Sequence, residues 1–337
     1  MAARETIIPV FVPHLGCPNN CVFCNQHHIS GEKKPADAET VFAAVEAAEG
    51  LVPPDAKREL AFYGGSFTAI PADNRRELLE AAGKLYECGK IDSIRLSTRP
   101  DAISEDILDE LRLYPVEIIE LGAQSLDEDV LLKSGRGHSA EAVYKASELV
   151  KSRGFGLILQ FMTGLPGDSD EKDILTAEKI IGIKPDGVRI YPTVIIKDTP
   201  LYSLWKKGIY KEHTVEDAVR VCSRIVPLFD AAGIPIIRLG LNPSDELSAG
   251  EAAGGAYHPA LGELVRSRIF RKRAEDLLCG VPAGAKVILG VNRSCISQMT
   301  GQHRCNIEYL KELYALSALK VVAADAKPGD VAVISAE

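Results

Sequence analysis

Residues 14–31 read HLGCPNNCVFCNQHHISG, and this stretch places three of the eight cysteines of the chain within eight residues. Cys17, Cys21 and Cys24 have the spacing C-x3-C-x2-C. The stretch directly follows IIPVFVPH, from Ile7, an apolar run typical of a buried parallel strand. Loops at the carboxyl ends of parallel strands carry the chemistry of α/β proteins, so this loop predicts a functional site.

The three thiols have two interpretations that the spacing leaves open. Three thiolates on a short loop can ligate three corners of an iron–sulfur cube and leave the fourth iron without a protein ligand. A structural zinc site needs four ligands, and the neighbouring His27 or His28 could supply the fourth. Small buried hydrophobes are a poorer interpretation, because CPNNC is polar and forms turns.

Length and composition indicate a globular protein with one large domain or two. The chain has 337 residues, of which 46% are hydrophobic and 26% charged. No run approaches the ~20 apolar residues of a membrane span, and the N-terminus lacks the basic region of a signal peptide. We therefore expect a cytoplasmic protein with reduced thiols and no membrane partner. The net charge of −8 argues against a nucleic-acid-binding surface that is basic all over.

Apolar runs alternate with amphipathic helical patterns as far as about residue 240. Helical patterns cover residues 38–52, 71–87, 139–154 and 214–233. The strand candidates are IIPVFVPH from Ile7, RELAFYGG from Arg58, SIRLSTRP from Ser93, EIIELGAQS from Glu117, GLILQFMTG from Gly156 and GVRIYPTVI from Gly187, with IPIIRLGL from Ile234 as a possible seventh. Six repeats of strand and helix predict an α/β fold with a parallel sheet, open or closed into a barrel.

The rhythm changes after about residue 245. A loop rich in small residues is followed by the basic helix LGELVRSRIFRKRAEDLL, the strand AKVILGV, a helix around NIEYLKELYALSA and the strand DVAVISA. We expect a main domain over residues 1–245 and a small α+β domain over residues 246–337.

Two motifs at consecutive strand ends resemble those of a known superfamily. GCPNNCVFC, with Phe23 directly before the third cysteine, resembles the cluster loop of radical S-adenosylmethionine (SAM) enzymes. FYGGSFT (62–68) resembles their glycine motif, which holds the methionine part of SAM. The resemblance implies a partial (β/α)6 TIM-like barrel, SAM as cofactor, and a [4Fe–4S] cluster ligated by Cys17, Cys21 and Cys24.

Further segments narrow the resemblance. LSTRPD (96–101), ELGAQSLDEDVL (120–131) and FMTGLPGDS (161–169) are similar to segments of oxygen-independent coproporphyrinogen III oxidases and of the Elongator catalytic subunit. RIYPTVIIKDTPLYSLWKKGIY (189–210) favours the Elongator family, which adds a carboxymethyl-type group to wobble uridine of tRNA.

The chain also departs from the Elongator pattern. That family spaces its cluster cysteines more widely and carries an acetyltransferase domain. Here fewer than a hundred residues follow residue 245, and they hold no recognisable acetyl-CoA phosphate loop. The resemblance therefore implies radical chemistry, with tRNA modification by a different route as the leading expectation.

The resemblance also implies site residues, which fall at or near predicted strand ends. The implied SAM-binding residues are Phe23, Gly64, Gly65, Ser66, Ser97, Thr98, Gln124 and Arg189. Tyr191 and Lys197, expected at the end of the sixth strand, are the candidates for contact with substrate and catalysis. A surface ion pair at Arg189 and a loop-capping amide at Gln124 are the structural alternatives. We expect Tyr63 to be a core side chain, and His14 to approach the cluster or to be structural.

The implied partners are an electron donor such as flavodoxin or ferredoxin, and tRNA. A radical enzyme acting on a small metabolite such as a tetrapyrrole is one alternative, and a non-catalytic zinc-binding interaction protein is another. The basic run RSRIFRKR (266–273) is either an RNA contact or a solvated helix face.

Five further cysteines need a place in the fold. Cys295 and Cys305, with His303, form a second metal site, a thiol pair or a reactive thiol, and these alternatives stay open. Cys88, Cys222 and Cys279 lie in helical patterns and are expected to be buried.

Overall fold

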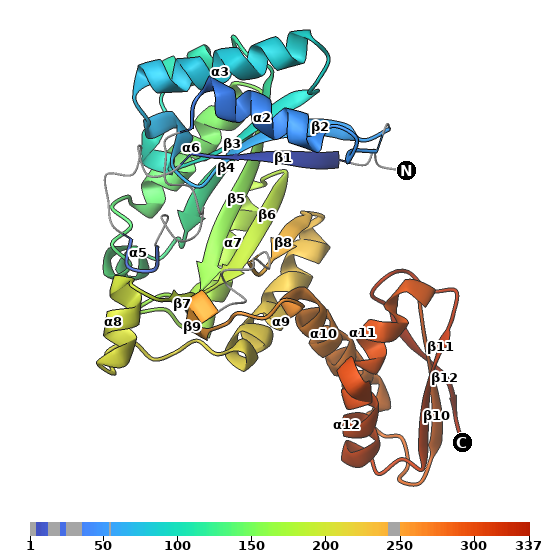
Figure 1. The fold of residues 1–337 in the computed structure, drawn as a ribbon. Helices are drawn as coiled ribbons and strands as arrows, with labels where there is room; N and C mark the ends of the chain where they lie inside the picture. Colours follow the sequence, from blue (N-terminus) through green and yellow to red (C-terminus); the bar gives the residue numbers. More distant parts are fainter. Residues whose placement is uncertain (1–4, 13–20, 25–35, 54, 242–249) are drawn as a thin grey trace.

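The computed structural model of the chain describes residues 5–12, 21–24, 36–53, 55–241 and 250–337. Its main element is a seven-stranded parallel sheet that curls into a half-barrel (Figure 1). The strands follow one another in the sheet in chain order: β1 (Glu5–Phe11), β2 (Lys57–Tyr63), β3 (Ser93–Thr98), β4 (Val116–Gln124), β5 (Gly156–Thr163), β6 (Gly187–Pro192) and β8 (Ile236–Leu239). The six predicted strands and the possible seventh are all present.

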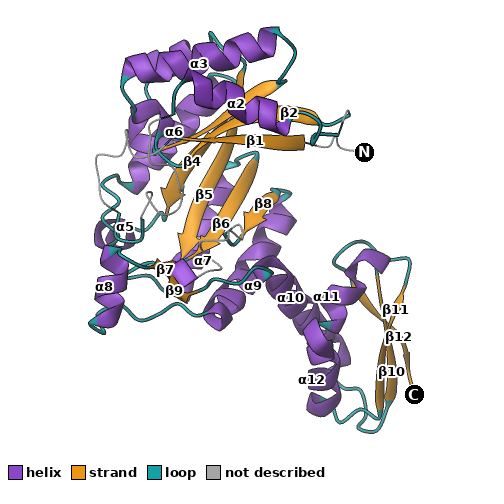
Figure 2. Cartoon of the chain, viewed as in Figure 1, coloured by secondary structure: helices purple, strands orange, loops and turns teal. Residues whose placement is uncertain are grey.

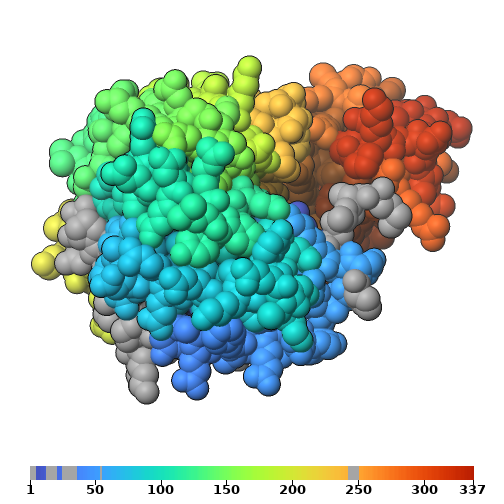
Figure 3. Space-filling view, turned by 90° about the horizontal axis from the view of Figure 1, so that it is seen from above, coloured from blue at the N-terminus to red at the C-terminus, as the bar shows by residue number. Residues whose placement is uncertain are grey.

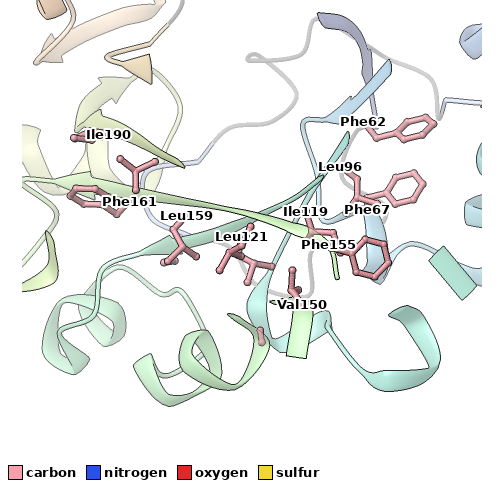
Figure 4. Packing of buried hydrophobic residues seen from close by; sticks show 14 of the residues in the cluster. Phe62, Phe67, Leu96, Ile119, Leu121, Val150, Phe155, Leu159, Phe161 and Ile190 are labelled. Carbon is pink, nitrogen blue, oxygen red and sulfur yellow. The ribbon is translucent and has the colours of Figure 1, made fainter. Parts of the chain in front are cut away.

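The main hydrophobic core lies between the sheet and its helices. Alternate residues of a strand point to opposite faces, so Leu60 and Phe62 of β2 are fully buried in this core while Tyr63 points the other way. Figure 4 shows β2 to β6 each contributing a side chain to the core, and the ring of Phe62 stacks on Phe67 at 4.5 Å. The opposite, concave face of the sheet is left for polar side chains.

Helices connect the strands, as parallel pairing requires. The connecting helices are α2 (Ala38–Ala48), α3 (Ala72–Glu87), α4 (Glu105–Leu111), α5 (Glu128–Lys133), α6 (Ala140–Ser152), α7 (Asp170–Ile183), α8 (Pro200–Lys206) and α9 (Val215–Ala232). A Ser, Thr or Asp side chain accepts from the first turn of most of them; for example, Ser139 caps α6 and Thr214 forms a capping box with Asp217 of α9.

A two-stranded antiparallel ribbon follows the sixth strand, and the sequence did not predict it. β7 (Val194–Ile196) pairs with β9 (Ala252–Gly255). Lys197 therefore follows a separate strand and does not lie at the end of β6, which ends at Pro192.

The C-terminal part is a three-stranded sheet with helices on one face, and it projects to one side of the half-barrel (Figures 2 and 3). Its elements are α10 (Leu261–Leu278), β10 (Lys286–Val291), α11 (Ile296–Thr300), α12 (Cys305–Leu313), β11 (Ala318–Ala323) and β12 (Val331–Ala336). β10 lies in the middle, parallel to β11 and antiparallel to β12. The prediction missed β11, which directly follows the predicted helix.

α10 connects the two parts of the molecule. Val265 and Ile269 from its first half belong to the main core, whereas Phe270 and Leu278 belong to a second core under the small sheet. The predicted division at residues 245 and 246 falls on residues outside the described part, and it stays a prediction. Within the described ranges, no helix has the length and apolarity needed to cross a bilayer.

Candidate functional site

The described part of the cysteine segment, residues 21–24, lies near the carboxyl end of β4, because Arg136 contacts both Cys21 and the carbonyl of Gly122. Cys21 is buried, and a tight turn connects it to Cys24, whose N–H donates to the carbonyl of Cys21 (3.0 Å). Val22 fixes this turn from two sides: its N–H donates to Ser134 (3.0 Å) and its carbonyl accepts from Leu201 of α8 (2.8 Å). Both thiols are free of disulfides. Cys17, His14, His27 and His28 lie outside the described residues.

A buried arginine faces this turn. Arg136 places Nη1 3.6 Å from Sγ of Cys21, and the side chain is 7% exposed. Its other donors bond to the carbonyl of Gly122 (2.7 Å) and to Nε2 of His138 (3.0 Å). Arg136 was not predicted from the sequence, because a single arginine in a loop has no periodicity that separates it from a surface residue.

The glycine motif directly follows β2. Gly64 has φ +96°, and an added Cβ would lie 3.4 Å from Phe11 and 3.6 Å from the backbone nitrogen of Val12 in the neighbouring strand. Only glycine adopts such a conformation without strain. Gly65 is partly exposed and Ser66 is buried beside it. Gly64 and Gly65 are both partly exposed beside the end of β1, so a ligand could reach their backbone.

The residues predicted on β3 point to opposite faces. The hydroxyl of Ser97 donates to the carbonyl of Phe62 (3.3 Å). The hydroxyl of Thr98 is buried and lies 2.6 Å from that of Thr68, on the helix side of the sheet. The structure thus brings Ser97 to the concave face but not Thr98.

Gln124 ends β4 in a strained conformation. Its φ is +66°, unusual for a residue other than glycine, and it follows a break in register between Gly122 and Gln124. Its side-chain amide exchanges two hydrogen bonds with that of Gln160 on β5, at 2.8 and 3.0 Å. The paired amides lie across the concave face and are not a loop cap.

A network of charged residues fills the concave face next to the pair of Gln124 and Gln160, centred on Glu120, which precedes Gln124 on β4. Glu120 on β4 accepts two hydrogen bonds from Arg189 on β6 (2.9 and 3.0 Å), one from Arg95 on β3 (3.0 Å) and one from Tyr63 (3.1 Å). Arg95 also pairs with the fully buried Glu59 at 2.6 Å. Arg189 is therefore part of an interior network and not of a surface ion pair.

The same network corrects the expectation for Tyr63. Its hydroxyl donates to Glu120 and accepts from Arg189 (3.0 Å), so Tyr63 belongs to the polar face and not to the hydrophobic core. Burial, followed by the negative charge of Glu120, raises the pKa of Tyr63, and burial also raises the pKa of Tyr191. Both phenols keep their protons at neutral pH and can act as hydrogen-bond donors.

The two residues predicted to contact substrate do not lie in the same environment. Tyr191 is partly buried beside Arg189 on the concave face. Lys197 is exposed beyond β7, where its backbone N–H donates to the carbonyl of Glu251 (3.1 Å). Their catalytic roles stay predictions.

The loop after β5 forms one wall of a cavity of about 610 Å³. Two carboxyl groups line it: Asp173 in the first turn of α7 is buried, and Asp168 in the loop is partly exposed. Burial raises the pKa of both, and for Asp173 the neighbouring Asp168 raises it further. The raised pKa of Asp173 means that this buried carboxyl group favours its protonated form.

The remaining candidates have structural environments. Cys295 is buried and Cys305 is exposed, and among the described residues no group of three or more His, Cys, Asp and Glu side chains could hold a metal ion. Cys222 is buried as predicted, whereas Cys88 and Cys279 are exposed, because each caps the end of a helix.

The basic run on α10 is largely paired within the chain. Arg266 bonds to Asp230 (2.6 Å) and Arg268 to Glu216 (2.5 Å), both on α9. Arg271 lies 4.4 Å from the ring of Tyr309 and 3.5 Å from Glu275. These contacts favour the structural interpretation of the run.

Comparison with known families agrees with this geometry. Residues 11–180 match the family described as Radical SAM superfamily, and residues 185–271 match the Radical_SAM C-terminal domain. The resemblance inferred from the sequence is confirmed.

Curated relatives include human Elongator complex protein 3, 33% identical over 192 residues, which are 51% of this chain and 35% of that protein. A tRNA uridine(34) acetyltransferase of Methanocaldococcus infernus is 35% identical over 201 residues, 54% of this chain and 38% of the relative. The match thus spans little more than a third of these relatives.

Among solved structures, the Elp3 of Methanocaldococcus infernus lacking residues 1–46 superimposes with a TM-score of 0.63 at 26% identity. The superposition covers 81% of this chain and 64% of that structure.

Proposed function

Because the chain belongs to the radical SAM superfamily and is a radical SAM enzyme, we propose that Cys17, Cys21 and Cys24 hold a [4Fe–4S] cluster that acts on SAM. One observation carries this proposal. Cys21 and Cys24 lie in one fixed turn near the carboxyl end of β4, and the guanidinium of Arg136 faces Cys21. Three closely spaced thiolates suffice for a [4Fe–4S] cluster with one open iron, whereas a structural zinc site needs a fourth ligand.

When both cofactors are bound, one-electron reduction cleaves SAM and supplies a 5′-deoxyadenosyl radical that abstracts a substrate hydrogen. The protein binds, orients and shields these groups. We assign the backbone at Gly64 and Gly65 to the methionine end of SAM. Gln124 and Arg189 orient its remainder from the concave face, with Phe23, Ser66 and Ser97 as further predicted contacts; Thr98, whose hydroxyl lies on the helix side of the sheet, is left out of the proposed site. Tyr191, protonated at neutral pH, supplies a hydrogen-bond donor on the concave face, while the O–H of Tyr63 donates to Glu120.

For the substrate we propose tRNA. The support is the match to a tRNA uridine(34) acetyltransferase over 201 residues, together with the segment at 189–210 that favours the Elongator family. Flavodoxin or ferredoxin is the class of protein that would deliver the electron.

A small metabolite is the second candidate substrate. The observation that favours it is the pairing of Arg266 and Arg268 with carboxylates of α9, which leaves the most basic helix with little free charge for phosphates. The net charge of −8 points in the same direction.

The cofactor assignment is tested by anaerobic reconstitution, iron and sulfide analysis, and measurement of 5′-deoxyadenosine after reduction with dithionite. We expect about four irons per chain and SAM cleavage, both lost in Cys21→Ala. Cys88→Ala, which removes an exposed thiol at the end of α3, is the matched control and should keep both. Zinc in place of iron would refute the assignment.

The substrate is tested separately with the reconstituted enzyme. Unmodified tRNA is incubated with enzyme, SAM and reductant, and its nucleosides are analysed by mass spectrometry. A new nucleoside that requires SAM supports tRNA. Unchanged tRNA, from an enzyme that still cleaves SAM, favours the small metabolite.

A further inference from the structure

Two surface helices, α5 and α8, hold the cysteine turn of residues 21–24 (Figure 1). The N–H of Val22 donates to the carbonyl of Ser134, the residue directly after α5, and the carbonyl of Val22 accepts from the N–H of Leu201 in α8. Val22 also packs against the apolar cluster that contains Leu201. Helix α8 therefore contacts the turn with one face, whereas the end of this helix is exposed to solvent.

Large aliphatic side chains are exposed beside both helices. Leu132 at the end of α5 is 80% exposed, and Ile209, just after α8, is 68% exposed. The two places are neighbours, because Lys133 and Ile209 line the same cavity of about 610 Å³, together with Lys211. A single exposed aliphatic side chain is ordinary, but several that gather at one place indicate an interaction surface.

The charge around Ile209 is positive. Three exposed lysines flank it in the sequence: Lys206, Lys207 and Lys211. None of the three forms an ion pair with a carboxylate of the described residues, and the acids Asp170 and Asp217 of the same cavity pair with Arg220. On a chain with a net charge of −8, these lysines form a local positive surface, which attracts an acidic partner.

The aromatic side chains of α8 favour a protein partner over RNA. Surfaces that bind single-stranded nucleic acid combine lysines with aromatic rings on which the bases stack. Here Nζ of Lys206 lies over the ring of Trp205 (4.6 Å) and over that of Tyr202 (5.4 Å), so a cation already occupies one face of each ring. The side chain exposed between the lysines is the aliphatic Ile209, as in a protein interface with an apolar centre and a charged rim.

We propose that Leu132, Lys206, Lys207, Ile209 and Lys211, together called the docking patch, bind the acidic surface of a flavodoxin that delivers the electron. The inference rests on the proposed function, because only a reducible cluster in the turn beside α8 requires a donor. The apolar centre of the patch suits the exposed edge of a flavin ring, and the lysines suit carboxylates around it. Interfaces between redox partners are small, so a patch of this size is sufficient.

The transfer at this surface moves one electron and no atoms. The anionic flavin hydroquinone of the partner loses one electron and becomes the neutral semiquinone, and the cluster gains that electron. No covalent bond forms or breaks, and no proton is transferred.

The test uses the reconstituted protein and a purified flavodoxin. Calorimetry gives the dissociation constant of oxidised flavodoxin, and stopped-flow absorbance gives the rate at which its hydroquinone reduces the cluster. We expect Lys207→Glu combined with Lys211→Glu to weaken binding about tenfold at low salt, and less at high salt because ions screen the charges. Ile209→Ser should weaken binding at both salt concentrations. Dithionite, which needs no docking, should reduce the cluster equally in all variants.

Matched variants elsewhere in the chain separate docking from general effects. Lys286→Glu combined with Lys320→Glu makes the same change in net charge at two exposed positions of the C-terminal sheet. Leu113→Ser removes an 80% exposed aliphatic side chain just after α4. Both should leave flavodoxin binding and the rate of cluster reduction unchanged.

The outcomes separate this inference from the proposed function. A wild-type protein that holds no cluster, or that cleaves no SAM with dithionite, refutes the proposed function and this inference with it. A wild type that cleaves SAM with dithionite, but binds flavodoxin no better than the double lysine variant does, overturns the inference alone. Loss of tRNA binding or of a dimer in the patch variants, with flavodoxin binding unchanged, would assign the patch to RNA or to a second copy of the chain. Binding of a ferredoxin in place of flavodoxin would exclude the flavin partner.

Discussion

At the scale of single residues, Glu120 organises the concave face of the sheet. One carboxylate receives hydrogen bonds from Arg189, Arg95 and Tyr63, which come from three different strands. Removing one member of a buried charge network leaves its partners charged and uncompensated, which costs more than the network contributes as a whole.

We predict that Glu120→Gln lowers the free energy of unfolding by about 3–5 kcal/mol, because it leaves Arg189 without a counter-ion. The control is Glu117→Gln on the same strand, where an exposed pair with Lys57 is lost at a cost below about 1 kcal/mol. Urea denaturation measures both. Equal losses in the two variants would contradict the buried network.

Gly64 offers a second prediction. Gly64→Ala forces a side chain into a conformation with positive φ, which costs about 1–2 kcal/mol, and it should also weaken SAM binding. Gly50→Ala carries the same kind of strain at φ +80° but meets no atom within 4 Å, so it should lose stability and keep SAM affinity. Calorimetry of SAM binding distinguishes them; an unchanged affinity in Gly64→Ala would remove this glycine from the site.

At the scale of elements, the order of strands and connecting helices followed from the sequence. Apolar runs and capping residues repeat regularly, and parallel pairing leaves little choice of order. The ribbon of β7 and β9 did not follow, because its strands are three and four residues long and lie more than 50 residues apart. β11 was missed because its sequence, ALKVVA, has no turn signal separating it from the preceding helix.

The contact between the loop after β5 and helix α7 depends on pH. The pKa of Asp173 is raised in the folded state, so the folded protein binds a proton that the unfolded chain releases above its ordinary pKa of 3.8. Stability contributed by this proton is present in acid and is lost as the pH rises from about 4 through the raised folded-state pKa.

We predict that Asp173→Asn, which mimics the protonated acid, removes this loss, so its stability relative to wild type increases with pH. Urea denaturation between about pH 2 and 8 measures the slope. Asp129→Asn gives the control of opposite sign: Lys133 and Lys172 lower the pKa of Asp129, so wild type gains stability from it as the pH rises toward the ordinary pKa of 3.8 and no more above it. A pH-independent difference for Asp173→Asn would contradict the raised pKa of Asp173.

At the scale of the whole molecule, two cores meet in one helix. α10 contributes to the main core with one half and to the C-terminal core with the other. The sequence predicted both parts, but not that a helix of 18 residues belongs to both, because an amphipathic pattern does not show which partner each turn contacts.

The sequence likewise did not predict which side chains of the site contact one another. Residues at strand ends were identified from motifs, whereas the network of Glu59, Arg95 and Glu120 was not. Its members lie up to 61 positions apart, and only the register of the sheet brings them together.

We predict that Leu289→Ala, in the centre of β10, destabilises the C-terminal core by about 2–5 kcal/mol. Native-state hydrogen exchange should show lost protection in β10 to β12, with β4 and β5 still protected. Ile334→Ala, on the exposed face of β12, should change little. Loss of protection throughout the molecule would instead mean that α10 couples both cores into one cooperative unit.

The incomplete barrel has a consequence for how it admits a ligand. A closed barrel fills its interior with interdigitated side chains, so that entry requires an empty volume. On the concave face of this half-barrel, Glu120 already accepts hydrogen bonds from three residues, Arg189, Arg95 and Tyr63. An incoming anion can take over one of these donors by exchange, with the number of hydrogen bonds conserved. Binding of a ligand then requires an exchange of hydrogen-bond partners and does not require the expansion of a packed interior.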